Sequence, residues 1–228
     1  MIRKTIKKLL SLSLVELLVG CGHPHYGDGH STFSPSQSRT IVILLDATKS
    51  WQYWLAAIEK LEKFSLTELG STDTFLALVL ITNRNFRVPA PFAEDVPRST
   101  DSDQIQIDFL RARNNFRSLL KELKENPPNF PPGTDLIGAL YEAQEIISAH
   151  ENPEVWLIIF SDLEDTVNQK IQLNLAQANV RCFYPQPGGD IEGFKRKVQS
   201  WTLRFREWNA QSVKIYDPSA SQITDLLQ

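Results

Sequence analysis

The chain has 228 residues, a net charge of −3 and two cysteines, Cys21 and Cys182. Proteins that bind nucleic acid usually carry a strong basic excess, so the charge does not support a nucleic-acid partner. Two cysteines are too few for a disulfide framework. The length suits one well-cored domain of about 185 residues, preceded by a targeting segment and a tether.

Residues 1–20 have the features of a secretory leader. Four basic residues and no acid in MIRKTIKK precede a mostly apolar stretch, Leu9–Val19, which is too short to span a bilayer comfortably and contains Glu16. Leu18-Val19-Gly20-Cys21 resembles the lipobox of bacterial lipoproteins. The resemblance implies that Cys21 is acylated and anchors the chain to a membrane of the bacterial cell envelope, with the domain outside the cytoplasm. The alternative is the N-terminal helix of a cytosolic protein.

Residues 21–39 are rich in Gly, Ser, Pro and His and contain few apolar residues. This composition is typical of a flexible spacer, so we predict a tether over 21–39 and a folded domain over 40–228.

Apolar runs predict the strands of the domain. Residues 41–45, 74–81 and 155–160 are short, almost wholly apolar segments, as expected for strands buried on both faces of a parallel sheet. Further strands are predicted over 180–184 and 212–216. Residues 85–91 alternate apolar and polar side chains around Pro89, which predicts an antiparallel edge strand forming a hairpin with 74–81.

Helical spacing of apolar residues predicts amphipathic helices over 51–69, 108–124, 134–148, 168–178 and 191–208, and a short helix from 221. Residues 92–107 are predicted to form an acidic surface loop, and the prolines of 126–133 exclude regular structure there. Because strands alternate with helices, the sequence predicts an α/β fold: a doubly wound, Rossmann-like, mostly parallel sheet with one antiparallel edge strand.

Polar side chains follow two of the predicted parallel strands. Asp46 ends the strand over 41–45 and is followed by Thr48 and Ser50, whereas Ser161 and Asp162 follow the strand over 155–160. In open α/β sheets, ligands bind beyond the carboxyl ends of the strands, where the strand order reverses. Carboxylate and hydroxyl oxygens at that point would suit Mg²⁺.

Asp46-Ala47-Thr48-Lys49-Ser50, Thr134 in GTD and Asp162 in IIFSD resemble the metal-ion-dependent adhesion site (MIDAS) of von Willebrand factor A (vWA) domains. The resemblance covers residues 39–228, with Thr48 where the family usually has Ser and Leu163 where it often has Gly. It implies a vWA-like fold and a non-enzymatic protein-binding module in which a partner's carboxylate completes the coordination of Mg²⁺ or Mn²⁺. The implied ligands are Asp46, Thr48, Ser50, Thr134 and Asp162.

Two other functions remain open. LLDAT resembles phosphotransferases of the haloacid-dehalogenase type, which would make Asp46 a nucleophile and place Mg²⁺ at Asp162. Those enzymes normally carry a second Asp where this chain has Thr48. The third possibility is a metal-free structural subunit of an envelope complex.

Overall fold

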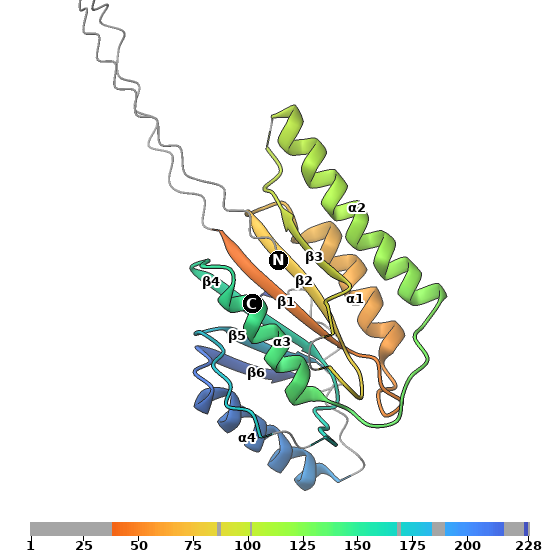
Figure 1. Cartoon of the computed structure of the whole chain (residues 1–228), viewed down its shortest axis with the longest axis vertical. Coiled ribbons are helices and arrows are strands. Elements are labelled where there is room, and N and C mark those ends of the chain that lie inside the picture. Colours follow the sequence, from red (N-terminus) through yellow and green to blue (C-terminus); the bar gives the residue numbers. More distant parts are fainter. Residues whose placement is uncertain are drawn as a thin grey trace, which may run out of the picture. The chain divides into compact units, whose positions relative to one another are not determined.

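Six strands in the described residues form one sheet. The computed structural model describes residues 38–85, 88–100, 102–167, 170–183, 190–216 and 226–227. The strand order is β3-β2-β1-β4-β5-β6 (Figure 1). All neighbouring strands run parallel except β3, which pairs antiparallel with β2. The strands are β1 (Arg39–Asp46), β2 (Thr74–Ile81), β3 (Phe92–Val96), β4 (Glu154–Phe160), β5 (Asn179–Phe183) and β6 (Ser212–Tyr216). The predicted mostly parallel sheet with one antiparallel edge strand is confirmed.

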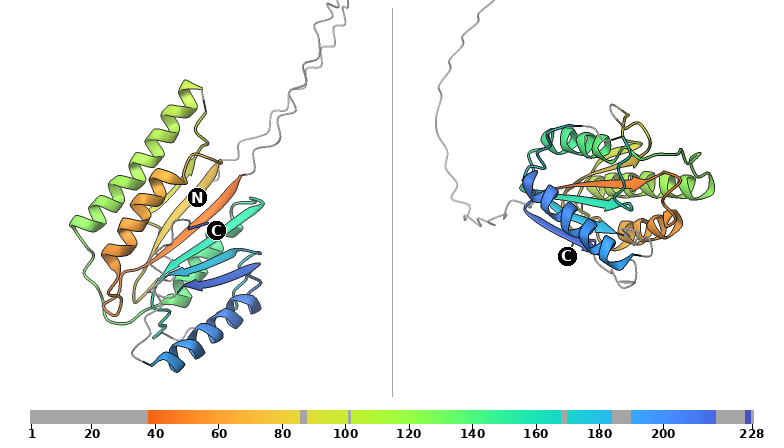
Figure 2. Two further views of the ribbon diagram at one scale, coloured as in Figure 1. Left: turned by 180° about the vertical axis from the view of Figure 1, so that it is seen from behind. Right: turned by 90° about the horizontal axis from the view of Figure 1, so that it is seen from below.

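Helices cover both faces of this sheet (Figures 1 and 2). The described helices are α1 (Trp54–Thr67), α2 (Asp103–Glu125), α3 (Leu136–Ser148) and α4 (Ile191–Glu207). Alternate residues of β1 enter two separate cores, one shared with α1 and α2 and the other with α3 and α4. Because both faces of β1 are buried, its sequence is a continuous apolar run instead of an alternating one.

The folded part begins at Arg39, which the sequence analysis assigned to the tether. Arg39 is the first residue of β1, and its guanidinium donates to Thr74 Oγ1 at 3.0 Å and to the Glu68 carbonyl at 2.9 Å. The predicted leader, Cys21 and nearly all of the predicted tether lie outside the described residues.

The antiparallel edge strand lies at 92–96, not at the predicted 85–91. Asn85 is fully buried and caps the end of β2, since its side-chain amide donates to the Leu80 carbonyl and its backbone N–H donates to Asp135 Oδ2 at 2.8 Å. Val88 N–H donates to the Asn85 carbonyl at 3.0 Å.

The predicted loop over 92–107 is also wrong at its other end, because α2 begins at Asp103 and not at 108. Ser102 precedes it in an extended conformation, and Asp103 places an acidic side chain in the first turn. This charge complements the positive end of the helix dipole and accounts for the earlier start.

No helix forms over 170–178, where the sequence predicted one over 168–178. Leu173 and Leu175 lie in an irregular segment, and their side chains are buried. The Leu175 N–H donates to the Trp208 carbonyl at 2.7 Å. The segment therefore obtains backbone partners from the connection between α4 and β6. The predicted helices over 51–69, 134–148 and 191–208 are confirmed to within three residues. The helix predicted from 221 begins outside the described residues, and 226–227 form a turn.

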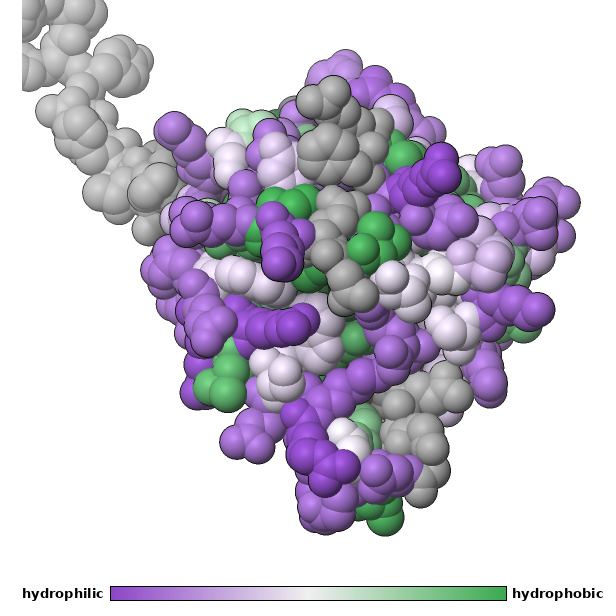
Figure 3. All heavy atoms as spheres, turned by 60° about the horizontal axis from the view of Figure 1, so that its bottom comes forward, coloured by the Kyte–Doolittle hydropathy of each residue, from purple (hydrophilic) through white to green (hydrophobic). Residues whose placement is uncertain are grey.

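The surface of the described residues is mainly polar on the face that Figure 3 shows. On the face shown in Figure 3, hydrophobic residues form small patches separated by hydrophilic ones. Within the described ranges, no helix is both long and apolar enough to cross a membrane.

Candidate functional site

The predicted site lies where the order of the strands reverses, between β1 and β4. Leu45 is in register with Phe160, so Asp46 and Ser161 leave the sheet side by side. Ser161 Oγ donates to Asp46 Oδ2 at 2.6 Å. This is the position at which open α/β sheets bind their ligands.

The turn after β1 gathers oxygen atoms around Asp46. Asp46 Oδ1 accepts from the Thr48 N–H at 3.0 Å and from Thr48 Oγ1 at 2.6 Å. Thr48 Oγ1 lies 3.1 Å from Ser50 Oγ. Asp46 and Thr48 are buried and Ser50 is exposed, so the turn leads from the sheet interior to the surface.

Thr134 brings a second segment to the same point. Its Oγ1 donates to Thr48 Oγ1 at 3.1 Å. The backbone of Thr134 is held by Thr166, whose Oγ1 accepts from the Thr134 N–H at 2.8 Å and whose N–H donates to the Thr134 carbonyl at 2.9 Å. The Thr48 hydroxyl is therefore within hydrogen-bonding distance of oxygens from Asp46, Ser50 and Thr134.

The residues on either side of Thr134 explain why this loop is fixed. Gly133 has φ +83°, and a Cβ there would lie 3.0 Å from Thr166 Oγ1. Asp135 is the N-cap of α3 and accepts from the Gly138 N–H at 2.9 Å and from the Asn85 N–H at 2.8 Å. These bonds tie the loop to the start of α3 and to the segment after β2.

Asp162 supplies the third segment. Its side chain hydrogen-bonds with Ser50 and accepts from the Glu164 N–H at 3.0 Å. Leu163, where the vWA family often has Gly, has φ +56° and is buried in the core shared with α3 and α4. The loop thus adopts the left-handed conformation that glycine takes most easily, and Leu163 adopts it while packing its side chain inward.

Lys197 attaches this loop to α4. Its Nζ donates to the Asp162 carbonyl at 3.1 Å and pairs with Glu164. The ammonium group therefore contacts both ends of the short segment 162–164.

Burial controls the electrostatics of the site. It raises the pKa of Asp46 to about 6, against the opposing effect of hydrogen bonds from Ser161 and Thr48, and the charge of Asp162 raises it further. Burial also raises the pKa of Asp162. Both carboxylates are thus harder to ionise than exposed ones, because the folded chain solvates their negative charge less well than water does.

The structure brings together all five residues of the predicted site. Sequence analysis did not assign roles to Ser161, Thr166 or Lys197. Ser161 could have been found, because it directly follows the predicted strand over 155–160, as Asp46 follows the strand over 41–45. No local signal indicated the other two, since their contacts depend on how distant segments pack. Among the described residues, no three His, Cys, Asp or Glu side chains are grouped to hold a metal ion, so a cation here would depend on hydroxyls as well as two carboxylates.

Fold and site together define an open, doubly wound α/β domain with an oxygen-lined centre at its switch point. No protein-family model and no curated protein matches the chain. Among solved structures, the chain is similar to a von Willebrand factor type A protein from Catenulispora acidiphila, with a TM-score of 0.40 and 16% identity. The similarity covers 81% of this chain and 40% of that one, so the chain spans less than half of that structure's length.

Proposed function

We propose that this protein is a membrane-anchored, divalent-cation-dependent protein-binding module of the vWA type. The proposal rests mainly on three oxygen atoms from separate residues that lie close to the Thr48 hydroxyl. Oxygens of Asp46, Ser50 and Thr134 lie 2.6, 3.1 and 3.1 Å from it. Asp162 joins the cluster through Ser50.

The donor set fits a hard cation. Mg²⁺ and Mn²⁺ prefer oxygen ligands, and two carboxylates would balance the charge of a divalent ion. Asp46, Thr48, Ser50, Thr134 and Asp162 would hold the ion directly or through water, and the bound ion would present a positive charge to a carboxylate of a partner protein. Because Ser50 is exposed, this residue lies on the side from which a partner would approach.

A binding role suits Asp46 better than a nucleophilic one. Its side chain is fully buried, and its two oxygens already accept hydrogen bonds from Thr48 and Ser161. A nucleophile of the haloacid-dehalogenase type must reach its phosphoryl substrate. The residue two positions on is Thr48, whose hydroxyl donates to Asp46 and provides no second carboxylate. The proposal therefore includes no catalytic step.

The membrane anchor rests on the sequence alone. The basic start, the apolar stretch and the lipobox support acylation of Cys21, which would hold the module at the bacterial envelope by its lipid chains. Mass spectrometry of protein extracted from membranes would show the mass of a diacylglyceryl group on Cys21 if this part is correct, and an unprocessed Met1 would contradict it.

Calorimetric titration of the full-length chain in detergent with Mg²⁺ and with Mn²⁺ tests the metal site. We expect heat of binding that is lost in Asp46→Asn and retained in Glu59→Gln, which changes an exposed carboxylate on α1. No heat with either ion would contradict the proposal. A crosslinking pull-down from membranes then tests the partner, and capture that EDTA leaves unchanged would favour a metal-free structural subunit.

A further inference from the structure

A groove of about 580 Å³ opens directly beside the site, between the start of α1 and the proline-rich loop 126–133. Its size is within the range of small-ligand pockets. Its main apolar lining comes from Trp51, Tyr53, Trp54, Leu55, Pro127 and Phe130. Trp51 follows Ser50 in the chain, so the groove begins at the exposed end of the proposed metal site.

The walls of the groove are held by packing and hydrogen bonds. The rings of Trp54 and Phe130 meet edge to face at 5.4 Å, and Trp54 Nε1 donates to the Leu123 carbonyl at 3.3 Å. The Lys49 N–H donates to the Pro131 carbonyl at 3.1 Å. The proline-rich wall is therefore fastened to the same turn that carries Thr48 and Ser50, and groove and site keep a fixed relation.

The lining of the groove is mostly apolar, and a basic residue, Lys49, lies on the turn that leads into it. Lys124, which also lines the groove, lies 3.3 Å from Glu62 and 3.7 Å from Glu59, so acidic neighbours balance its charge. Lys49 is exposed on the turn between Thr48 and Ser50. A ligand that matches this surface is anionic at one end and apolar at the other.

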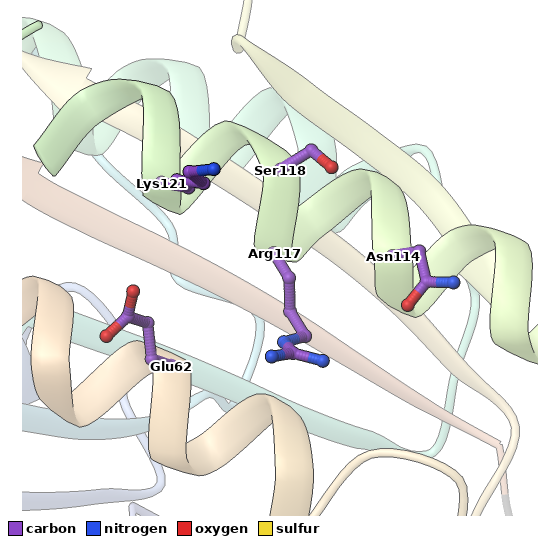
Figure 4. Close-up of a pocket in the computed structure, with 5 residues that line it drawn as sticks. All are labelled: Glu62, Asn114, Arg117, Ser118 and Lys121. Carbon is purple, nitrogen blue, oxygen red and sulfur yellow. The ribbon is translucent and has the colours of Figure 1, made fainter. Parts of the chain in front are cut away.

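A second hollow, of about 470 Å³, lies between α1 and α2 and has a different character (Figure 4). Charged and polar side chains line it, including Glu62, Arg117 and Lys121. None of its five lining residues is hydrophobic, so the groove beside Ser50 is the better match for a partner's hydrophobic side chain.

We propose that the groove binds an aromatic side chain of an extended partner segment whose carboxylate, two residues away, occupies the cation. The proposal rests on the proposed function of the same site. Side chains two residues apart point to the same side of an extended chain, so one segment would present its carboxylate and its ring to the same face of the domain. Aromatic rings suit the groove because edge-to-face contacts with the partly exposed Tyr53 and Phe130 would add to the burial of apolar surface.

The test uses three capped peptides, Gly-Asp-Gly-Trp-Gly, Gly-Asp-Gly-Ala-Gly and Gly-Asn-Gly-Trp-Gly, titrated into the full-length chain in detergent with saturating Mg²⁺. The peptide with both Asp and Trp is expected to bind at least about tenfold more tightly than either of the others.

A matched pair of variants locates the contact. Leu55 and Leu66 are similarly exposed on α1, at 55% and 54%, but Leu66 does not line the groove. Leu55→Ser should lower the affinity for the Gly-Asp-Gly-Trp-Gly peptide about fivefold and leave Mg²⁺ binding unchanged. Leu66→Ser should change neither affinity.

The outcomes separate this proposal from the proposed function. Equal Mg²⁺-dependent binding of the two Asp peptides would contradict binding of the aromatic side chain in the groove. It would not contradict the proposed metal-dependent binding module. Equal binding of the two Trp peptides would show that the groove does not act with the cation and would also overturn the inference. Absence of Mg²⁺ binding in the calorimetric titration would overturn both.

Discussion

Replacing Asp46 by Asn should stabilise the metal-free domain at pH 7. Burial raises the pKa of Asp46 from its usual 3.8 to about 6 in the folded chain. A carboxyl group with a raised folded pKa contributes stability below its unfolded pKa and loses it as the pH rises through its folded pKa. At about 1.4 kcal/mol for each pH unit between the two values, ionised Asp46 costs the folded domain about 3 kcal/mol at pH 7.

Asparagine removes that cost but keeps most of the local hydrogen bonds. Its oxygen can still accept from Thr48, and its amide can donate to Ser161 Oγ, which already accepts from the Leu163 N–H at 3.1 Å. The Ser161 hydroxyl then loses its carboxylate acceptor, at a cost of about 1 kcal/mol. We therefore expect the free energy of unfolding of Asp46→Asn to exceed that of the wild type by about 2 kcal/mol in EDTA at pH 7.

Urea unfolding at pH 4 and pH 7, with EDTA or with Mg²⁺, measures these differences. At pH 4 wild-type Asp46 is protonated in the folded state, so the advantage of Asp46→Asn should disappear. Mg²⁺ at a hundredfold excess over its Kd should stabilise the wild type by about 2.7 kcal/mol and leave the variant unchanged. A variant less stable than wild type at pH 7 in EDTA would refute the burial argument. Equal stabilisation of both by Mg²⁺ would show that Asp46 is not a ligand.

Three further measurements address the rest of the site. Mg²⁺ affinity should fall as the pH decreases through about 6, because protonated Asp46 binds the cation poorly, and a titration independent of pH between 5 and 7 would contradict this. Leu163→Ala should destabilise the domain more than Leu163→Gly in chemical unfolding, since only glycine relieves the strain of φ +56°, and the reverse order would contradict it. Lys197→Met should weaken Mg²⁺ binding about tenfold by releasing the 162–164 loop, whereas Lys195→Met, which changes an exposed lysine paired with Glu192, should not. Equal effects of the two lysine variants would remove Lys197 from the support of the site.

Local patterns were sufficient for the five parallel strands of the sheet and for the oxygen-bearing residues that meet at its centre. Each central strand is buried on both faces, so its apolar run is visible without knowledge of the fold, and the alternation with helices then requires parallel strands. Asp46 and Asp162 were identifiable because parallel strands bring their carboxyl ends to one edge.

Contacts between distant segments determined three features that the sequence did not predict: the position of the edge strand, the irregular segment before β5 and the contact of Lys197 with the site loop. Asn85 donates its N–H to Asp135, fifty residues away, and the edge strand lies at Phe92–Val96, beyond the predicted residues 85–91. Leu173 and Leu175 are buried without a helix because the connection after α4 supplies backbone partners. Lys197 reaches the site loop only through the packing of α4, and no pattern near Lys197 in the chain encodes that distance. Long-range hydrogen bonds of this kind depend on the folded arrangement and therefore leave no periodic signal in the sequence.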